Sequence, residues 1–419
     1  GSEMCIRDSA RAAWMQQRAR YAQQRFSGPA PAYPLTYNHW YTTRFSVDQA
    51  FLDRQLAAVE PYGFDAFIID AGWYRHVGDW TPLPEKFPEG AFEAFMQRIE
   101  QCGMTPGIWS CPQFVQGSEA KRAPEAEVPP HHERFIDGYL LDLAGSDFRA
   151  FLEGHVALLR RRYHASWWKY DQLFFAPEGR AGHMRNVLAL QDALAAVRRA
   201  EPDLIIENCQ SGGRMINEFT ALLAQSHWIR DGGNNGMGHA RSNLSEALGA
   251  MGFLFPWGAC RWTNNPDQMD ANNDELTRFY CRSAMMGTWG IVADLPRIGE
   301  HQRAVICEEV AHYRRLNAFK TSCLYDLQLP GRGANAAGVT FYKPDGRGAG
   351  VVLYRWNAKG SFTHTLDLAH LNAAERYCVE DADAKTITEA EGQALQANGL
   401  DVPFPQQRLS ALVFVEAAE

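Results

Sequence analysis

Short apolar runs alternate with longer amphipathic runs along the chain from residue 35 onward. The apolar runs predict strands at 35–41, 64–73, 104–112, 166–171, 203–209, 226–231, 251–257 and 289–295. The amphipathic runs predict helices between them, for example over 47–59, 148–163, 184–200 and 301–317. Strands that alternate with helices are typical of a parallel α/β fold, because each return to a parallel neighbour needs a crossover.

The number of strand and helix pairs favours a closed barrel. Eight such pairs fall within about 285 residues, close to the ~250 residues of a typical (β/α)8 TIM barrel. We therefore predict an α/β protein with a (β/α)8 barrel over residues 31–319, and a doubly wound sheet is the alternative. Residues 1–30 are polar and rich in Arg and Gln, and we treat them as a leader.

After Asn317 the pattern of apolar and polar residues changes to a period of two. The stretches "GVTFYKP", "GAGVVLYRWN", "FTHTLDL" and "RLSALVFVE" alternate apolar and polar residues, and turns rich in Gly, Asn, Asp and Pro separate them. This pattern predicts a small antiparallel β-sandwich domain over residues 320–419.

Composition and charge narrow the range of partners. The chain is 46% hydrophobic and holds 12 Trp, 15 Tyr and 23 Phe, so many flat side chains are available to stack on a ligand. A net charge of −8 without a Lys/Arg cluster argues against a nucleic acid or an anionic membrane surface as partner. The nine cysteines include no C-x-x-C pair and indicate reduced thiols. We expect a cytoplasmic protein, with a signal peptide already removed as the alternative, and no apolar run is long enough to span a membrane.

Charged residues and tryptophans stand at the ends of the predicted strands, where a barrel places its active site. These residues are Trp40, Asp70, Trp73, Trp109, Lys169, Asp171, Cys209 and Asp231. Lys169 and Asp171 are two residues apart and therefore point to the same side of their strand. Carboxylates from different strands in an aromatic cup are typical of glycoside hydrolysis, and a nearby lysine keeps a carboxylate nucleophile ionised.

Each of these residues also has a purely structural interpretation. An acid at a strand end can cap the next helix, a single tryptophan is more often core than sugar platform, and Cys209 alone is more often an inert buried thiol. The coincidence of several such residues at predicted strand ends favours function.

The segments "FIIDAGWY", "WWKYD", "IENCQSGGRM", "SHWIRD" and "MMGTWGIVADL" occur in this order. Together they resemble the retaining α-galactosidases of glycoside hydrolase family 36, the melibiase group, which shares a clan with family 27. The resemblance covers roughly residues 35–320. It implies Asp171 as nucleophile and Asp231 as acid/base. It also implies sugar contacts by Asp70, Trp73, Trp109, Lys169, Cys209 and Gly212; we add Trp40 for its strand-end position.

Two positions depart from the family pattern. Ala71 replaces the second of two adjacent acids on strand two, and Gln113 stands where the family often has glutamate. The loss of an acceptor weakens discrimination for galactose, so a modified galactoside is an alternative substrate.

The sequence thus predicts a retaining, exo-acting α-glycosidase, and an α-galactosidase in particular. The alternatives are an α-N-acetylgalactosaminidase, a transglycosylase similar to raffinose synthase, and a catalytically silent sugar-binding barrel. The expected partner is an oligosaccharide or glycoside, and no cofactor or metal is expected, because the acidic stretch 267–275 lacks the residues of a calcium loop. A homo-oligomer and a monomer are both open.

Overall fold

The computed structural model describes residues 14, 17, 21, 24–26, 33–75, 80–111, 114–115, 138–139, 143, 148–171, 179–231, 237–251, 254–322, 324–329, 331 and 333–418. The predicted leader and Gln113 lie largely or wholly outside these residues. In the described part of the chain, no helix combines the length and the apolar character that crossing a membrane requires.

The described strands of the first sheet close into a barrel in the order β1-β10-β9-β8-β7-β6-β3-β2. Their bounds are β1 Leu35–Asn38, β2 Ala66–Ile69, β3 Thr105–Ser110, β6 Trp167–Tyr170, β7 Ile205–Asn208, β8 Ser226–Trp228, β9 Ala259–Asn264 and β10 Thr288–Val292. Strands that follow one another in the chain lie side by side, which confirms the predicted (β/α)8 barrel. Between β3 and β6, the strands β4 Phe114–Val115 and β5 Gly138–Tyr139 form a separate antiparallel pair.

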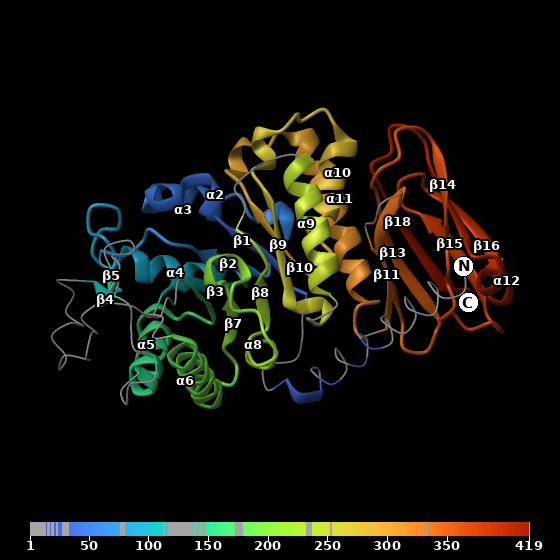
Figure 1. The fold of residues 1–419 in the computed structure, drawn as a ribbon. Coiled ribbons are helices and arrows are strands. Elements are labelled where there is room, and N and C mark those ends of the chain that lie inside the picture. The colour runs from blue at the N-terminus through green and yellow to red at the C-terminus, as the bar shows by residue number, and fades with distance from the viewer. Residues whose placement is uncertain are drawn as a thin grey trace. The chain divides into compact units, whose positions relative to one another are not determined.

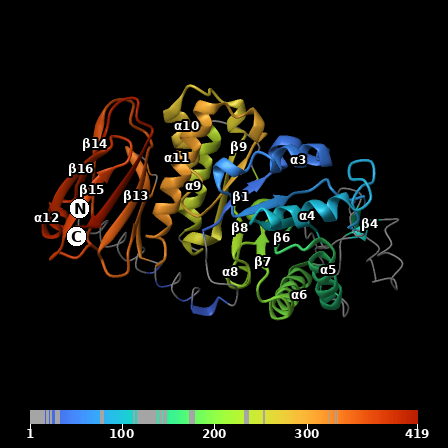
Figure 2. The same ribbon diagram turned by 180° about the vertical axis from the view of Figure 1, so that it is seen from behind.

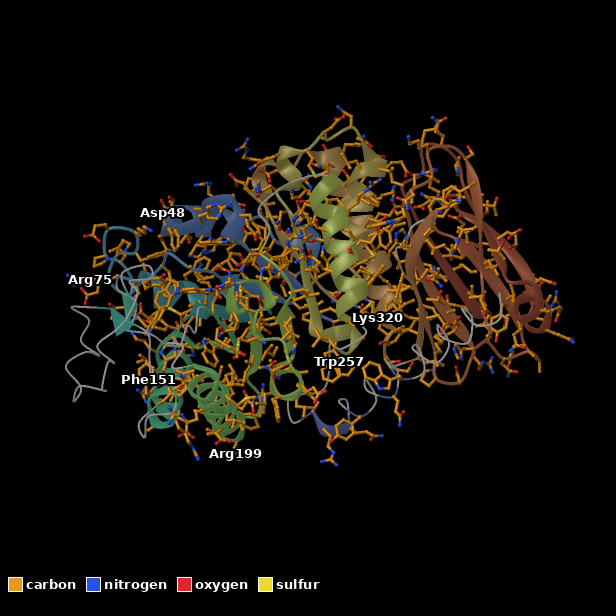
Figure 3. All side chains as sticks on the ribbon, viewed as in Figure 1. Asp48, Arg75, Phe151, Arg199, Trp257 and Lys320 are labelled. Carbon is orange, nitrogen blue, oxygen red and sulfur yellow. The ribbon has the colours of Figure 1, made fainter. Side chains whose placement is uncertain are left out.

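Helices follow the barrel strands, and Figures 1 and 2 show α4, α5 and α6 beside strands of the first half of the barrel. The helix bounds are α2 Trp40–Thr43, α3 Gln49–Leu56, α4 Ala91–Gln101, α5 Phe148–Tyr163, α6 Gly179–Ala200, α7 Gln210–Gly213, α8 Thr220–Leu223, α9 Met237–Ala250, α10 Asp274–Arg282, α11 Glu300–Asn317 and α12 Gly392–Asn398. Helix α3 begins after Asp48, labelled in Figure 3, whose carboxylate accepts the Phe51 N–H at 2.8 Å. This cap satisfies a backbone donor that the first helical turn leaves free.

The prediction for the seventh strand was wrong. The sequence predicted 251–257, whereas Pro256–Gly258 is a 3-10 helix and the strand is β9, Ala259–Asn264. Strand β9 escaped the apolar pattern because it carries Arg261, whose side chain is 1% exposed and lies 3.6 Å from Glu246 of α9. A buried charge paired with a neighbouring helix looks like a surface residue in the sequence alone.

The C-terminal strands form two antiparallel sheets, which confirms the predicted β-sandwich. One sheet has the order β11-β12-β13-β18-β15-β16, and the other pairs β14 with β17. The bounds are β11 Tyr325–Gln328, β12 Ala336–Tyr342, β13 Gly348–Arg355, β14 Phe362–Leu366, β15 Arg376–Asp381, β16 Thr386–Glu391, β17 Leu400–Phe404 and β18 Ser410–Ala417. Apolar side chains of both sheets, such as Val351, Val413, Val402 and Phe404, pack into one core.

A buried ion-pair network joins this sandwich to α10 and α11. Arg282 in α10 is wholly buried and donates to Glu309 at 2.7 Å and to Asp383 at 2.5 Å. Burial by itself raises the pKa of Glu309, but the Arg282 charge outweighs it and lowers that pKa to about 2. Removing any one member of this network would leave a buried charge without its partner, which costs about 3–5 kcal/mol.

By internal contacts the chain divides into two compact units. One comprises residues 25–233 and 290–297, and the other comprises residues 1–24, 234–289 and 298–419. The domain boundaries at residues 30 and 320 stay predictions.

Candidate active site

The strand ends of the first compact unit carry the predicted site residues. Asp70 follows β2, Asp171 follows β6, Cys209 follows β7 and Asp231 lies shortly after β8. All belong to the unit that contains residues 25–233. The structure therefore brings to one rim of the barrel residues that are far apart in the sequence.

Lys169 and Asp70 form a buried ion pair at this rim. The Lys169 Nζ lies 2.8 Å from Asp70 Oδ2, and both side chains are less than 5% exposed. Asn38 donates to the same oxygen at 2.8 Å. Burial by itself raises the pKa of Asp70, but the Lys169 charge outweighs it and holds that pKa below the ordinary value. Asp70 is therefore an anion with fixed orientation.

His39, which the sequence analysis missed, supports Asp70 from β1. Its Nε2 accepts the Asp70 N–H at 2.9 Å, so Nδ1 carries the proton and donates to the Thr43 hydroxyl at 2.9 Å. Burial lowers the pKa of His39 to about 4, which keeps the ring neutral. The available signal was the pair of polar residues Asn38 and His39 within the predicted first strand.

Glu207, also missed, is a second acid beneath Lys169. It lies within β7 and is fully buried, with Oε1 3.6 Å from Lys169 Nζ and Oε2 accepting the Trp167 indole N–H at 2.8 Å. Burial by itself lowers the pKa of Lys169, but Asp70 and Glu207 raise it well above the ordinary value. The Lys169 ammonium also lies 5.4 Å from the ring centre of Trp228. Lys169 is therefore a fixed cation that contacts residues from the ends or interiors of β2, β7 and β8.

Asp171 is held through both carboxylate oxygens. Oδ1 accepts the Ser211 N–H at 2.6 Å, and Oδ2 accepts the Trp109 indole N–H at 3.1 Å. The side chain is almost completely buried, and burial raises the pKa of Asp171. The Ser211 amide, the Lys169 charge and the Trp109 indole oppose this rise, whereas the Asp231 charge adds to it. The sequence predicted that Lys169 keeps Asp171 ionised. The direct partner of Lys169 is Asp70, however, and the pKa of Asp171 stays above its ordinary value.

A left-handed turn presents the Ser211 amide to Asp171. Residues 210–213 all have positive φ, at 48°, 51°, 80° and 82°, and the Gly213 N–H donates to the Cys209 carbonyl at 2.8 Å. Gln210 and Ser211 pay a steric cost of about 1–2 kcal/mol each in this region of φ. Strain of this kind persists where the surrounding structure fixes it, and it is concentrated at functional sites.

The same turn lies against the backbone that carries Asp231. A Cβ at Gly212 would be 2.3 Å from the Asp231 amide nitrogen and 3.0 Å from the Arg230 carbonyl carbon. Asp231 in turn accepts the Trp228 indole N–H at 2.9 Å, and its side chain reaches solvent. The sugar contact predicted for Gly212 stays a prediction; the structure shows that Gly212 lies close to the Asp231 backbone. One turn thus positions both aspartates.

Gly212→Ala is expected to lower activity because the new methyl group displaces the Asp231 backbone, the Ser211 amide or both. A misplacement of about 1 Å costs on the order of 10²-fold in rate, so we expect a loss of about that size in kcat/KM, with lower thermal stability. The matched control is Gly154→Ala in α5, where nothing lies within 4 Å of the added Cβ; that helical change should stabilise slightly. Wild-type kinetics in Gly212→Ala would contradict this assignment of the turn.

The tryptophans divide into a direct partner of Asp171 and supporting residues. Trp109 donates to Asp171, and its carbonyl accepts the Trp73 indole N–H at 3.0 Å. Trp73 is fully buried and stacks on Phe92 with ring centres 4.8 Å apart, which gives it a structural role behind Trp109. Trp40 is partly exposed beside Phe45. The predicted sugar contacts of these tryptophans stay predictions.

Cys209 and Ala71 are both buried beside the charged residues. Burial raises the pKa of Cys209 well above the ordinary value, with the Asp171 charge adding to the rise, so Cys209 stays a neutral thiol. Ala71 donates its N–H to Asp70 Oδ1 at 2.8 Å and brings no second acid to the rim. The sugar contact predicted for Cys209 stays a prediction.

The chain is similar to known proteins in sequence and in fold. The sequence model of the Melibiase family matches residues 4–321. Alpha-galactosidase 1 of Pediococcus pentosaceus is 23% identical over 373 residues, which cover 82% of this chain and 49% of that protein. The crystal structure of the α-galactosidase from Lactobacillus brevis has a TM-score of 0.80 at 20% identity, over 98% of this chain and 58% of the other. A doubly substituted variant of the α-galactosidase AgaA of Geobacillus stearothermophilus, in complex with stachyose, also gives a TM-score of 0.80, at 18% identity, over 96% of this chain and 58% of that chain.

The chain spans about half the length of the curated relatives it matches. The structural likenesses confirm the barrel and the C-terminal sandwich. The family match covers residues 4–321 of 419 and contains every predicted site residue. It confirms the resemblance: this chain belongs to the Melibiase family.

Proposed function

We propose that the protein is a retaining, exo-acting α-glycosidase, and specifically an α-galactosidase, with Asp171 as nucleophile and Asp231 as acid/base. The observation that carries this proposal is the double hold on Asp171, whose carboxylate accepts from Ser211 and Trp109. Two hydrogen bonds orient the carboxylate while burial strips it of water, which suits a nucleophile. Asp231 stands near enough for its charge to raise the pKa of Asp171, yet its side chain reaches solvent.

The proposed reaction has two displacements. In the first, a carboxylate oxygen of Asp171 bonds to the anomeric carbon, the bond from that carbon to the departing oxygen breaks, and Asp231 protonates that oxygen. In the second, Asp231 takes a proton from water, the water oxygen bonds to the anomeric carbon, and the ester bond to Asp171 breaks. Asp231 thus alternates between its protonated and ionised forms and needs contact with water.

The Asp70–Lys169 pair supports recognition of a sugar. A fixed anion beside a fixed cation offers acceptors and donors to adjacent hydroxyl groups, and buried charges discriminate strongly against ligands that leave them without a hydrogen bond. The relatives that match this chain are named α-galactosidases, and one binds stachyose. We therefore propose oligosaccharides with a terminal α-galactosyl residue as substrates.

The test is hydrolysis of 4-nitrophenyl α-galactoside, followed by NMR of the first sugar released. α-Galactose as the first product would support the double displacement. β-Galactose as the first product would indicate an inverting mechanism instead. A panel with the α-glucoside, α-mannoside and α-N-acetylgalactosaminide should show a preference for the galactoside. Folded protein that hydrolyses none of them would leave the silent sugar-binding barrel as the better interpretation.

The pH dependence of activity should report the raised pKa of Asp171. The nucleophile must be ionised, so kcat/KM falls as pH drops through this pKa, and the acid limb lies above the ordinary aspartate value. Trp109→Phe removes a hydrogen bond that favours the anion, and should move the limb to higher pH. Asp231→Asn removes a negative charge, and with a 2,4-dinitrophenyl substrate the limb should move to lower pH. Shifts in the opposite directions would contradict this role of Asp171.

Ala71 favours a second candidate substrate. Ala71 places a methyl group where the family pattern has its second acid. In the family, that acid binds sugar hydroxyl groups. A galactoside modified at the 4- or 6-hydroxyl, which the missing acid would contact, is therefore our second candidate. It would be favoured if such a glycoside, added to the same panel, had the higher kcat/KM.

A further inference from the structure

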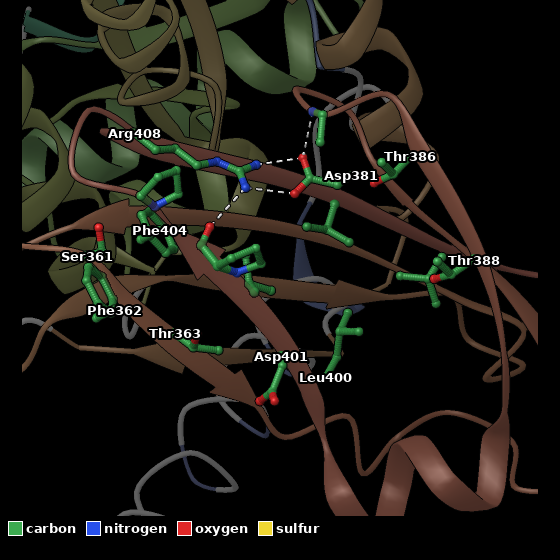
Figure 4. A pocket seen from close by; sticks show the side chains of 16 residues that line it. Ser361, Phe362, Thr363, Asp381, Thr386, Thr388, Leu400, Asp401, Phe404 and Arg408 are labelled. Carbon is green, nitrogen blue, oxygen red and sulfur yellow. Dashed lines mark hydrogen bonds and ion pairs between the residues drawn. The ribbon is translucent and has the colours of Figure 1, made fainter.

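The C-terminal sandwich contains a cavity of about 820 Å³, shown in Figure 4. All its lining residues fall between Ser361 and Val413, so it shares no residue with the candidate active site. It is bounded by the small sheet β14-β17 and by strands β15, β16 and β18 of the large sheet. Its volume falls within the roughly 300–1,000 Å³ of pockets that hold small ligands.

The cavity face of β16 is polar where a closed sandwich would be apolar. Thr388 pairs with Val379 and Thr386 pairs with Asp381, and opposite residues of an antiparallel pair share a face. Both threonines are exposed and line the cavity, whereas Ile387 between them points to the other face and is 68% exposed. This reversal of the usual pattern indicates that the inner face of β16 is built for contact with water or a polar ligand.

The opposite wall supplies a flat apolar surface. Phe362 and Phe404 stack with ring centres 4.8 Å apart and an interplanar angle of 5°. Figure 4 shows Phe362 across the cavity from Thr388. Asp401 also lines the cavity, but it is exposed and projects from the opposite face of β17 to Phe404. It keeps one carboxylate oxygen beyond the one that accepts the Thr365 hydroxyl at 2.6 Å. Aromatic faces flanked by hydroxyl and carboxylate groups match the two kinds of surface of a sugar ring.

The charges in the cavity argue against an anionic ligand. Among the described lining residues Arg408 is the only cation, and its two terminal nitrogens donate to Asp381, Asp383 and the Pro403 carbonyl. Its Nε donates to the Ser410 carbonyl at 3.1 Å. Every guanidinium nitrogen therefore has a protein partner. The polar groups left for a ligand are hydroxyls and a carboxylate oxygen.

We propose that this cavity binds a neutral oligosaccharide, with the Thr386 and Thr388 hydroxyls and Asp401 bonding its hydroxyl groups and Phe362 contacting its apolar face. This binding does not depend on hydrolysis in the barrel. It would hold a longer glycan on the protein independently of the active site.

The test is calorimetric titration of the full chain with maltotriose, cellotriose and mannotriose. These probes have no α-galactosyl end and are poor ligands for the proposed active site. At least one should bind saturably. The double variant Thr386→Val, Thr388→Val removes both hydroxyls at constant shape and should weaken binding about tenfold or more, because two hydrogen bonds of about 1 kcal/mol each are lost.

The matched control is Ile387→Val, on the same strand but the opposite face, which should bind like wild type. Hydrolysis of 4-nitrophenyl α-galactoside should be the same in all these variants. If the double variant does not fold, Asp401→Asn on the exposed side of β17 replaces it, with weaker binding expected. No saturable binding of any trisaccharide by wild type, or unchanged binding in the cavity variants, would overturn the proposal. Absence of α-galactosidase activity would leave this result unaffected.

Discussion

Asp171→Gly is expected to lower kcat for 4-nitrophenyl α-galactoside by on the order of 10⁴ or more, the scale on which enzymes lose rate when a nucleophile is removed. The loss follows because the oxygen that bonds to the anomeric carbon is gone, while the Ser211 and Trp109 donors remain without their acceptor. Asp171→Asn should show a similar loss with little change in shape. The control is Asp203→Asn, which changes a surface aspartate that pairs with Arg160. The Asp203 side chain is 67% exposed, so this variant should retain activity.

Azide separates the roles of the two aspartates. In Asp171→Gly, azide can bond to the anomeric carbon from the vacated side while Asp231 protonates the departing oxygen, which gives the β-galactosyl azide. In Asp231→Ala, a 2,4-dinitrophenyl leaving group departs without protonation, the ester forms on Asp171, and azide then releases the α-galactosyl azide. The same anomer from both variants, or full activity in Asp171→Asn, would contradict the assignment.

Lys169→Met is expected to destabilise the barrel by about 3–5 kcal/mol, the usual cost of removing one member of a buried ion pair. The methionine fills similar space but leaves Asp70 and Glu207 without their shared cation. Urea unfolding followed by tryptophan fluorescence measures the loss. The control Lys343→Met removes a partly exposed lysine 3.4 Å from Glu416, and pairs of that kind contribute about 0–1 kcal/mol.

The sign of the pH dependence provides a second check on Lys169. Asp70 has a pKa below its ordinary value, so its contribution to stability is present above the ordinary aspartate pKa and is lost as pH falls through the lowered one. In Lys169→Met this contribution is absent. The difference between wild type and variant should therefore shrink on acidification. A constant difference at all pH values would indicate that packing, and not charge, accounts for the effect of Lys169.

The sequence by itself determined the barrel and most of its rim. The alternation of apolar and amphipathic runs identified strands and helices, because in a parallel sheet buried on both faces the strands are nearly continuous apolar runs. The charged residues that interrupt such runs, Asp70, Lys169 and Asp171, could be placed at strand ends for the same reason. Period-two alternation after Asn317 likewise determined the sandwich.

Tertiary structure alone decided which of these residues contact one another. The pairing of Lys169 with Asp70 joins residues that are 99 positions apart. Arg261 is a charged residue that the sequence alone does not place inside a barrel strand, and its burial in β9 depends on the nearby Glu246 of α9. The left-handed turn at 210–213 depends on its packing against the Asp231 backbone, which no local preference of Gln210 or Ser211 predicts. Local periodicity records which side of an element is buried, whereas ion pairs, strained turns and cavities arise from the three-dimensional packing of distant segments, and only the folded chain specifies them.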